Sequence, residues 1–467
     1  MNDSRRRDGL LRLYGPGELD QLDPVGAPRA PGDQLLRLCT RQLFSYRADD
    51  LRGWQSVAPV PDLAAAIPSI YNAGVGASYT SYVVQLRPGV LWDTAPPRPV
   101  TAHDVVRGLK RLGNPFRPPR VLPYFTGTIR GMAEFHDGFR SAFAGHDPSA
   151  AALAEYQNTH EIAGILVLDD ETLVFELIRP SLEILDILAL PCASPAPVEY
   201  DAFLPDSPEL RRNIRSLGPY RPRPGSSDGH LVLEHNPVWR QDLDPVRHRN
   251  LAALEVTREP VSAQEVAEKI RAGEADLPWG VPLSSATPHD PADLGFTLDY
   301  LVFNTRSPGA GGALGKVKVR QAIAYAIDKA AVAEVVAASG TGAAIRPATS
   351  IVPPGNDAHQ PLDVTPTRGH RGDAARSRAL LAEAGYPDGL TVTAIAPATD
   401  VGRRIAQACA AGLAEAGITV QITALDQRAY RSLLQDPEHA ETGEWDIATA
   451  SWAAGWRYRN GRAFLEP

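Results

Sequence analysis

The chain has 467 residues, more than one compact core usually holds, which predicts two or three domains. Its 43% of hydrophobic and 22% of charged residues are ordinary for a globular protein, and no long apolar run predicts a membrane span. The formal net charge of -8 disfavours a nucleic-acid partner, because phosphate binding needs a basic surface.

The cysteines and histidines predict no metal site. Cys39, Cys192 and Cys409 lie far apart and form neither a CxxC pair nor a zinc-ligand spacing. The 11 histidines show no HxH or HExxH pattern, and we read His230, His235 and His248 as surface or loop residues. We therefore expect no metal and no cofactor.

The first half of the chain alternates between strand-like and helix-like segments. LLRLY, from residue 10, predicts a strand, and QLLRLCTRQLFSY, from residue 34, predicts a short helix or strand. Residues 77–92 alternate as an antiparallel hairpin would, with a turn at Pro88 and Gly89. Thr101 is a suitable N-cap for a helix from Ala102 to about Leu112. Further predicted elements are strand pairs at 163–177 and 218–236 and a helix at 262–272 that ends at Gly273.

The second half follows an α/β pattern. LDYLVFNT, from residue 298, predicts a buried strand, and residues 317–338 predict one long helix. A helix capped by Asp373 is expected next, and then a strand, a helix and a strand between 390 and 425, which is a βαβ unit with a parallel sheet. A helix near 426–434 and the strand DIATA complete this lobe.

Two short motifs imitate catalytic or phosphate-binding sites. GSSDG at 225–229 fits the G-x-S-x-G nucleophile elbow, but the strand that follows it makes it a hairpin turn, because an elbow requires a helix there. GAGGALGK at 309–316 lacks both the P-loop glycine spacing and the Ser or Thr after the lysine. Neither motif predicts an enzyme.

A series of longer motifs, in order along the whole chain, resembles the family 5 extracellular solute-binding proteins of peptide and nickel ABC transporters. The motifs are LRPGVLWDTAPPRPVTAHDVVRGLKR (86–111), GPYRPRPGSSDGHLVLEHNPVW (218–239), IRAGEADL (270–277), LVFNTRSP (301–308), VRQAIAYAIDK (319–329), LLAEAGYPDG (380–389) and SWAAGW (451–456). The resemblance implies an α/β, two-lobed periplasmic-binding-protein-like (type 2) fold with an extra domain inserted in the first lobe. Lobe I would be residues 1–50 and 163–264, the inserted domain 51–162, and lobe II 265–467.

The two ends of the chain depart from the family pattern. Members usually carry an export signal before the first strand, whereas MNDSRRRDGLL has no apolar core and no cleavage site. Members also continue beyond the point where this chain stops, at AFLEP. We therefore expect a chain that lacks its signal and is truncated at its C-terminus.

The resemblance places the ligand against the segment that follows the strand DIATA, where a peptide would pair with the backbone. In relatives an Asp of this segment meets the peptide's amino terminus; Gly455 stands there, so either Asp446 or Glu466 replaces it or the ligand lacks a free amine. Tyr46 is expected on the lobe I face of the cleft, and Asn304 is expected to order backbone at the crossover, at the hinge or cleft. The predicted ligand-binding residues are Tyr46, Ser451, Trp452, Ala453, Ala454, Gly455 and Trp456.

The function that this resemblance implies is that of the substrate-binding component of an ABC importer. It would bind a short peptide or peptide-like solute between two lobes, catalyse nothing, and deliver the solute, as a monomer, to a permease in the membrane. It would act outside the cytoplasm, held by a signal or lipid anchor absent from this chain. Three alternatives remain open: a cytoplasmic ligand sensor, a biosynthetic enzyme on the same fold, and a metal-chelate binder.

Overall fold

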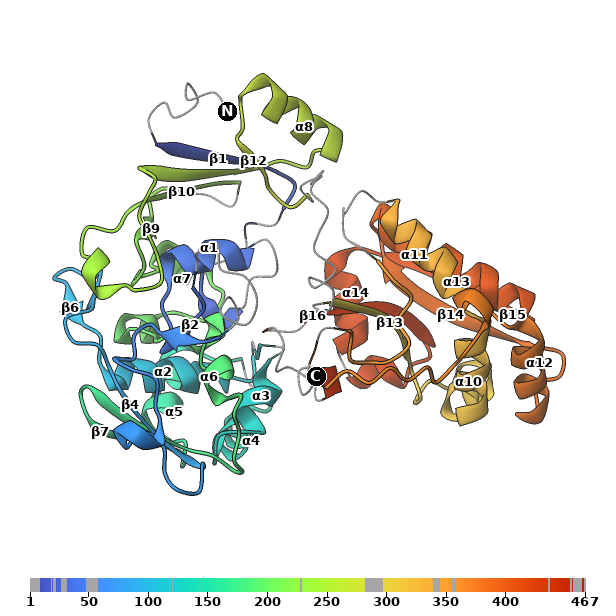
Figure 1. The fold of residues 1–467 in the computed structure, drawn as a ribbon, viewed down its shortest axis with the longest axis horizontal. Coiled ribbons are helices and arrows are strands. Elements are labelled where there is room, and N and C mark those ends of the chain that lie inside the picture. The colour runs from blue at the N-terminus through green and yellow to red at the C-terminus, as the bar shows by residue number, and fades with distance from the viewer. Residues whose placement is uncertain are drawn as a thin grey trace. The chain divides into compact units, whose positions relative to one another are not determined.

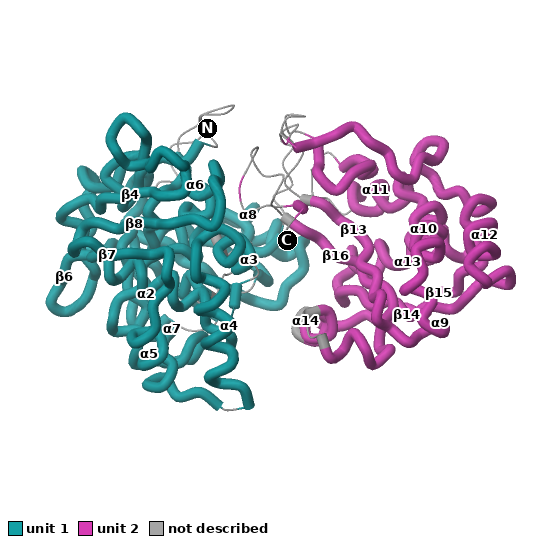
Figure 2. The backbone as a smooth tube through the Cα atoms, turned by 90° about the horizontal axis from the view of Figure 1, so that it is seen from below, with its two compact units in different colours: residues 1–281, 466–467 teal, residues 282–465 magenta. Residues whose placement is uncertain are grey.

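The computed structural model divides the chain into two compact units, unit 1 with residues 1–281 and 466–467 and unit 2 with residues 282–465 (Figure 2). Their helices and strands are labelled in Figure 1. The structure describes residues 9–17, 19, 22–26, 32–47, 58–116, 118–119, 121–145, 147–226, 229–281, 297–338, 345–354, 356, 358–435, 437–453, 456 and 464–465.

Unit 1 is built around a five-stranded sheet with the order β12-β1-β11-β10-β9. Its strands are β1 (Leu10–Gly15), β9 (Tyr220–Pro222), β10 (His230–His235), β11 (Ala253–Arg258) and β12 (Leu277–Pro278). β1 runs parallel to β11 and β12, whereas β10 runs antiparallel to β9 and β11. The strand predicted at LLRLY and the strand pair predicted at 218–236 are confirmed.

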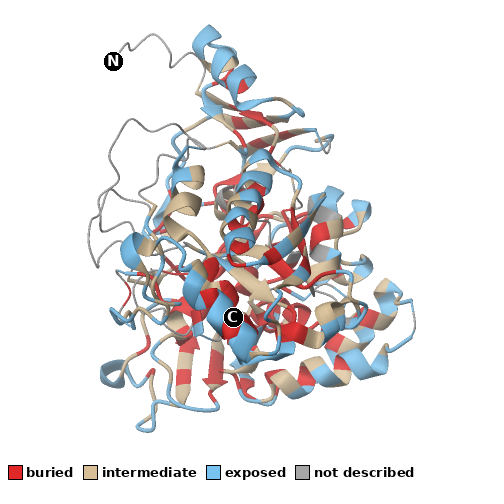
Figure 3. Cartoon of the chain, turned by 90° about the vertical axis from the view of Figure 1, so that its right-hand side faces the viewer, coloured by how far each residue is buried: buried red, intermediate tan, exposed pale blue. Residues whose placement is uncertain are grey.

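The two faces of this sheet meet different partners, because successive side chains of a strand point to opposite faces. Leu233 and Val256 lie in a core cluster with residues of α1 (Gly32–Cys39), and Tyr14 packs on the other face with Val266 of α8 (Ala263–Ala272). α8 begins at a Ser262 capping box and ends at Gly273, as predicted. Buried and exposed residues alternate in this way along the helices and strands of both units (Figure 3).

A second sheet of unit 1 has the order β4-β8-β7, with β4 (Ser81–Gln85), β7 (Ile165–Asp169) and β8 (Thr172–Glu176) all antiparallel. The hairpin predicted within 77–92 is wrong. β4 pairs with β8, because Tyr82 and Val84 lie opposite the buried Phe175 and Leu173, and β5 (Leu91–Trp92) pairs instead with β6 (Arg98–Pro99). The β7–β8 pair itself was predicted.

One further helix of unit 1 begins at its predicted cap. α2 (Ala102–Leu112) starts with a capping box between Thr101 and Asp104. Asp104 is only 2% exposed, and its carboxylate also accepts hydrogen bonds from Trp92 and from both terminal nitrogens of Arg98. The other helices of unit 1 are α3 (Leu122–Thr126), α4 (Met132–Ala142), α5 (Ala150–Thr159), α6 (Ile184–Ile187) and α7 (Pro208–Arg212), and β2 (Phe44–Ser45) and β3 (Val60–Pro61) form a short ladder.

Four buried charges join distant segments of unit 1. Arg41 Nε lies 2.7 Å from Asp62, and Arg247 lies 2.8 Å from Asp62 and 3.3 Å from Asp244. Burial alone would raise the pKa of Asp244, but the charges of Arg247 and Arg41 hold it below its usual value. This stabilisation is therefore complete above the unfolded pKa of about 4 and is lost as the pH falls through the lower folded value.

Unit 2 contains a four-stranded sheet with the order β13-β16-β14-β15. Its strands are β13 (Thr297–Phe303), β14 (Leu390–Pro397), β15 (Ile418–Leu425) and β16 (Ile447–Ala453), and its helices are α9 (Gly309–Gly312), α10 (Val317–Ala326), α11 (Lys329–Ala337), α12 (Ala374–Glu383), α13 (Asp400–Glu415) and α14 (Gln427–Gln435). β14 and β15 are parallel and joined by α13, which confirms the predicted βαβ unit.

Two predictions for unit 2 are wrong. Residues 317–338 form two helices, because Ile327 is extended and the side chain of Asp328 caps α11 by accepting from the N–H of Ala331. β13 is an edge strand of the described sheet and is half-exposed, with Tyr300 at 37%. Its apolar residues suggested a buried strand because periodicity alone does not distinguish an apolar edge from a covered centre.

The three-part domain division stays a prediction. The structure does show that α8, inside which the predicted boundary at residue 265 falls, and β12, which lies beyond it, both belong to unit 1, because β12 pairs with β1. No helix among the described residues is both long enough and apolar enough to span a membrane.

We expect Asp62→Ala to lower the free energy of unfolding of unit 1 by about 3–5 kcal/mol, because Arg41 and Arg247 lose a shared, fully buried counter-charge. Urea unfolding followed by circular dichroism measures the loss. Lys318→Ala is the control, since it removes an exposed ion pair to Glu383. Similar losses in the two variants would contradict a structural role for the buried cluster.

Candidate functional site

β16 carries the predicted ligand-binding segment and is only partly covered by its neighbours. β13 pairs with it over its whole length, from Phe303 opposite Ile447 to Thr297 opposite Ala453. On the other side, β14 pairs with Ile447 and Ala448 only. Among the described strands, none pairs with the second side of β16 from Thr449 onward.

The hydrogen-bond register shows which residues of β16 face this second side. The N–H of Asn304 donates to the carbonyl of Asp446 over 2.8 Å, so this pair is bonded across the β13–β16 ladder. Bonded and non-bonded pairs alternate along an antiparallel ladder. The backbone groups of Ala448, Ala450 and Trp452 therefore face β13, and those of Thr449, Ser451 and Ala453 face away from it.

Asp446 fixes the beginning of β16. Its carboxylate accepts hydrogen bonds from the hydroxyl of Ser307 (2.6 Å) and the N–H of Thr393 (2.8 Å), and the residue is 2% exposed. Its own N–H donates to the carbonyl of Thr393. Both carboxylate oxygens are thus engaged inside unit 2, so Asp446 is poorly suited to replace the missing amine anchor. Glu466, the other suggested replacement, lies outside the described residues.

Asn304 orders backbone, which is the role that the sequence favoured. It is 4% exposed, and its side-chain amide donates to the carbonyls of Ala440 and Trp445, each over 2.9 Å. Its side-chain oxygen accepts from the N–H of Arg306. Asn304 therefore fastens the segment before β16 to the end of β13.

The residues of the predicted segment differ in their solvent exposure. Ser451 is exposed and Trp452 is partly exposed, whereas Trp456 is buried. Of the two tryptophans, Trp452 is therefore the better placed to stack on a ligand. The backbone of Ala453 ends β16, and Ala454 and Gly455 lie outside the described residues. Direct ligand contact by these residues stays a prediction.

Tyr46 belongs to unit 1 and contacts a buried acid. Its hydroxyl donates to Asp186 over 2.6 Å, and Arg37 donates to its carbonyl. Burial, with the charge of Asp186 as a second cause, raises the pKa of Tyr46 far above its usual value, so the phenol stays neutral. The hydroxyl thus links β2 to α6, while the partly exposed ring remains a predicted contact.

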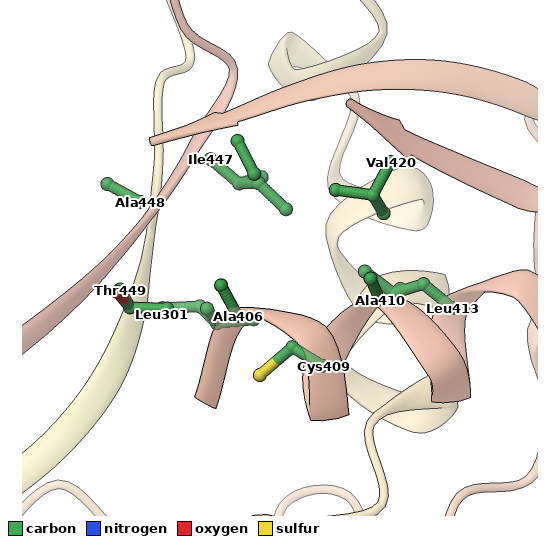
Figure 4. Close-up of a pocket in the computed structure, with 10 residues that line it drawn as sticks. Leu301, Ala406, Cys409, Ala410, Leu413, Val420, Ile447, Ala448 and Thr449 are labelled. Carbon is green, nitrogen blue, oxygen red and sulfur yellow. The ribbon is translucent and has the colours of Figure 1, made fainter. Parts of the chain in front are cut away.

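The described residues of unit 2 line a small apolar cavity. Its volume is about 10 Å³, and it lies between α13 and the sheet of unit 2, lined by Leu301, Cys409, Leu413 and other apolar residues (Figure 4). It holds about one water molecule at most. Burial raises the pKa of Cys409 to about 11, so this thiol is unreactive.

The described residues assemble no metal site. They contain no group of three or more His, Cys, Asp or Glu side chains placed to hold an ion. His230 lies 2.6 Å from Glu255, and His235 contacts the carbonyl of Leu251. The two histidines have different partners and, because side chains alternate along a strand, point to opposite faces of β10, so they do not share a centre.

Sequence reasoning missed Tyr430, which lies beside the candidate edge. Its hydroxyl donates to the carbonyl of Thr449. The only available signal was a tyrosine on the amphipathic helix predicted near 426–434, and helical spacing does not say which strand its hydroxyl reaches.

Comparison with known proteins agrees with this architecture. Residues 58–466 match the family described as "Bacterial extracellular solute-binding proteins, family 5 Middle". The glutathione-binding protein GsiB of Salmonella choleraesuis (strain SC-B67) is 26% identical over 436 residues, which cover 86% of this chain and 80% of GsiB. The periplasmic oligopeptide-binding protein OppA of Salmonella typhimurium is 25% identical over 473 residues, which cover 98% of this chain and 76% of OppA.

A solved structure gives the same result. The structure titled "Clavulanic acid biosynthesis oligopeptide binding protein 2" is similar with a TM-score of 0.74 at 27% identity, covering 100% of this chain and 80% of that one. The predicted α/β, two-lobed periplasmic-binding-protein-like (type 2) fold is confirmed.

We expect Asn304→Ala to speed hydrogen exchange across residues 440–446, because one buried and one partly buried carbonyl lose their donor, at a cost of about 1–3 kcal/mol. Hydrogen-exchange mass spectrometry measures this segment directly. Asn158→Ala is the matched control, since that exposed amide donates to Asp201 at the surface of unit 1. Exchange at the wild-type rate in Asn304→Ala would show that the segment is held by other contacts.

Proposed function

Because the chain belongs to the bacterial extracellular solute-binding proteins of family 5, we propose that it is the substrate-binding component of an ABC importer that takes a short peptide or peptide-like solute. The family is described as one of extracellular solute-binding proteins. We propose that this chain catalyses nothing and that, as a monomer, it delivers its ligand to a membrane permease.

The observation that carries this proposal is the open side of β16. Ser451 and Ala453 direct their N–H and C=O groups to a side on which the described strands offer no partner. An extended peptide satisfies such groups by adding as a further strand, which recognises main chain and tolerates many side chains. Trp452 and the exposed Ser451 lie on the same stretch.

The names of the relatives narrow the ligand class. GsiB is named for glutathione, which is a tripeptide, and OppA and the similar solved structure are named for oligopeptides. A site that reads backbone fits both kinds of ligand. The motif that this chain resembles implies an acid where Gly455 stands, and the glycine favours a peptide-like ligand whose amine is absent or bound elsewhere.

Native mass spectrometry of the protein purified from its own host tests the proposed function. We expect a co-purifying peptide or peptide-like mass that is lost on denaturation, because a strand-like ligand with several backbone hydrogen bonds dissociates slowly. An empty protein that also ignores a library of short peptides would contradict the proposal. That result would favour one of the alternative functions, which are metal-chelate binding, ligand sensing and biosynthesis.

Gly455→Asp should raise the affinity for peptides with a free α-amine by about tenfold, because a carboxylate would supply the missing counter-charge. Isothermal titration calorimetry measures the gain. The same peptide with an acetylated amine is the control and should gain nothing. No gain for the free amine, or a loss, would show that the ligand's amino terminus does not lie beside residue 455.

A further inference from the structure

A tyrosine of another helix contacts the first backbone carbonyl on the open side of β16. β14 leaves β16 after Ala448, and the next carbonyl that faces this side is that of Thr449. This carbonyl accepts the hydroxyl of Tyr430 from α14. We propose that Tyr430 blocks the first position of the ligand-pairing edge and thereby sets the register and the preferred length of the bound peptide. This inference rests on the proposed function.

Tyr430 is held firmly enough to act as a stop. The residue is 6% exposed and packs in a cluster with Ile395, Trp445 and Ala448. Its N–H donates to the carbonyl of Asp426, whose carboxylate also accepts from the N–H of Ala429. The phenol is therefore fixed by the core behind it and by the start of α14, and it does not depend on a ligand for its position.

The blocked position leaves a short stretch of β16 for pairing. Within the described part of the strand, Ser451 and Ala453 are the residues beyond Thr449 whose backbone groups face the open side. Two residues that are two apart in a strand are separated by about 7 Å, which is the reach of three extended ligand residues. A ligand strand that runs past Thr449 therefore meets a carbonyl that is already engaged, so the edge favours a ligand that ends before this residue.

A purely structural reading of the same contact also exists. A buried tyrosine hydroxyl needs a hydrogen-bond partner, and the carbonyl of Thr449 supplies one. On that reading Tyr430 contributes to stability but has no effect on which peptide lengths bind. The length preference is therefore the measurement that separates the two roles.

Two variants of Tyr430 test the proposal with alanine peptides of about three to six residues, extended at either end. Tyr430→Leu keeps an apolar side chain in the cluster but removes the ring from the edge. We expect the longer peptides to gain about three- to tenfold in affinity relative to the tripeptide, the effect of one added backbone hydrogen bond. Tyr430→Phe keeps the ring and removes only the hydroxyl, so its length preference shows which of the two blocks the edge.

The outcomes are separable. A wild-type length preference in Tyr430→Leu overturns the proposal, whereas a shift in both variants supports it and assigns the stop to the hydroxyl alone. If Tyr430→Leu does not fold, a crystal structure of the wild-type protein with a bound alanine peptide decides the matter: a ligand bonded to the backbone of Thr449 overturns the proposal. A wild-type protein that binds no peptide of any length would instead contradict the proposed function.

Discussion

One buried carboxylate, that of Asp446, determines where the candidate ligand strand begins. It joins three pieces of chain that are far apart in sequence, accepting from Ser307 after β13 and from Thr393 on β14 while its own residue leads into β16. A buried carboxylate is costly unless each oxygen finds donors, so these contacts fix the strands in a single register. The alternation of backbone groups along β16 follows from that register, and so does the side on which a peptide can add.

Unit 1 also contains buried charges that join distant segments, and it contains more of them. The Arg41–Asp62 and Arg247–Asp244 pairs bind segments that no local pattern connects, and they are almost fully buried. Such pairs contribute less net stability than their short distances suggest, because desolvation offsets most of the attraction. Their larger effect is on which fold the chain adopts, because a fold that separates the two partners leaves a buried charge without a counter-charge. Both units thus depend on buried charges placed where distant segments meet.

Local signals explain what could be predicted from the sequence. Thr101, Ser262 and Asp373 cap helices where expected, because a cap and its hydrogen bond lie within one turn of chain. The βαβ unit was readable because its connection is constrained in hand and length. The pairing partner of a strand was not readable from the sequence. The hairpin predicted at 77–92 is wrong for that reason, because β4 pairs with β8, some ninety residues further along the chain. The break between α10 and α11 was missed because the cap at Asp328 lies inside an unbroken helical period.

The candidate site shows the same limit in its chemistry. The motif SWAAGW predicts β16 as the ligand strand, but the groups that we expect to bind the ligand are backbone N–H and C=O groups, which every sequence carries. What gives them a function is the place where neighbouring strands stop, together with a tyrosine on a different helix. In a site of this kind, affinity and selectivity have different sources. The strand edge can bind any extended peptide through its backbone, and the side chains at the ends of the edge determine which peptide binds. A substitution at such an end, as at Tyr430, would then change which ligand binds and leave the binding edge of β16 in place.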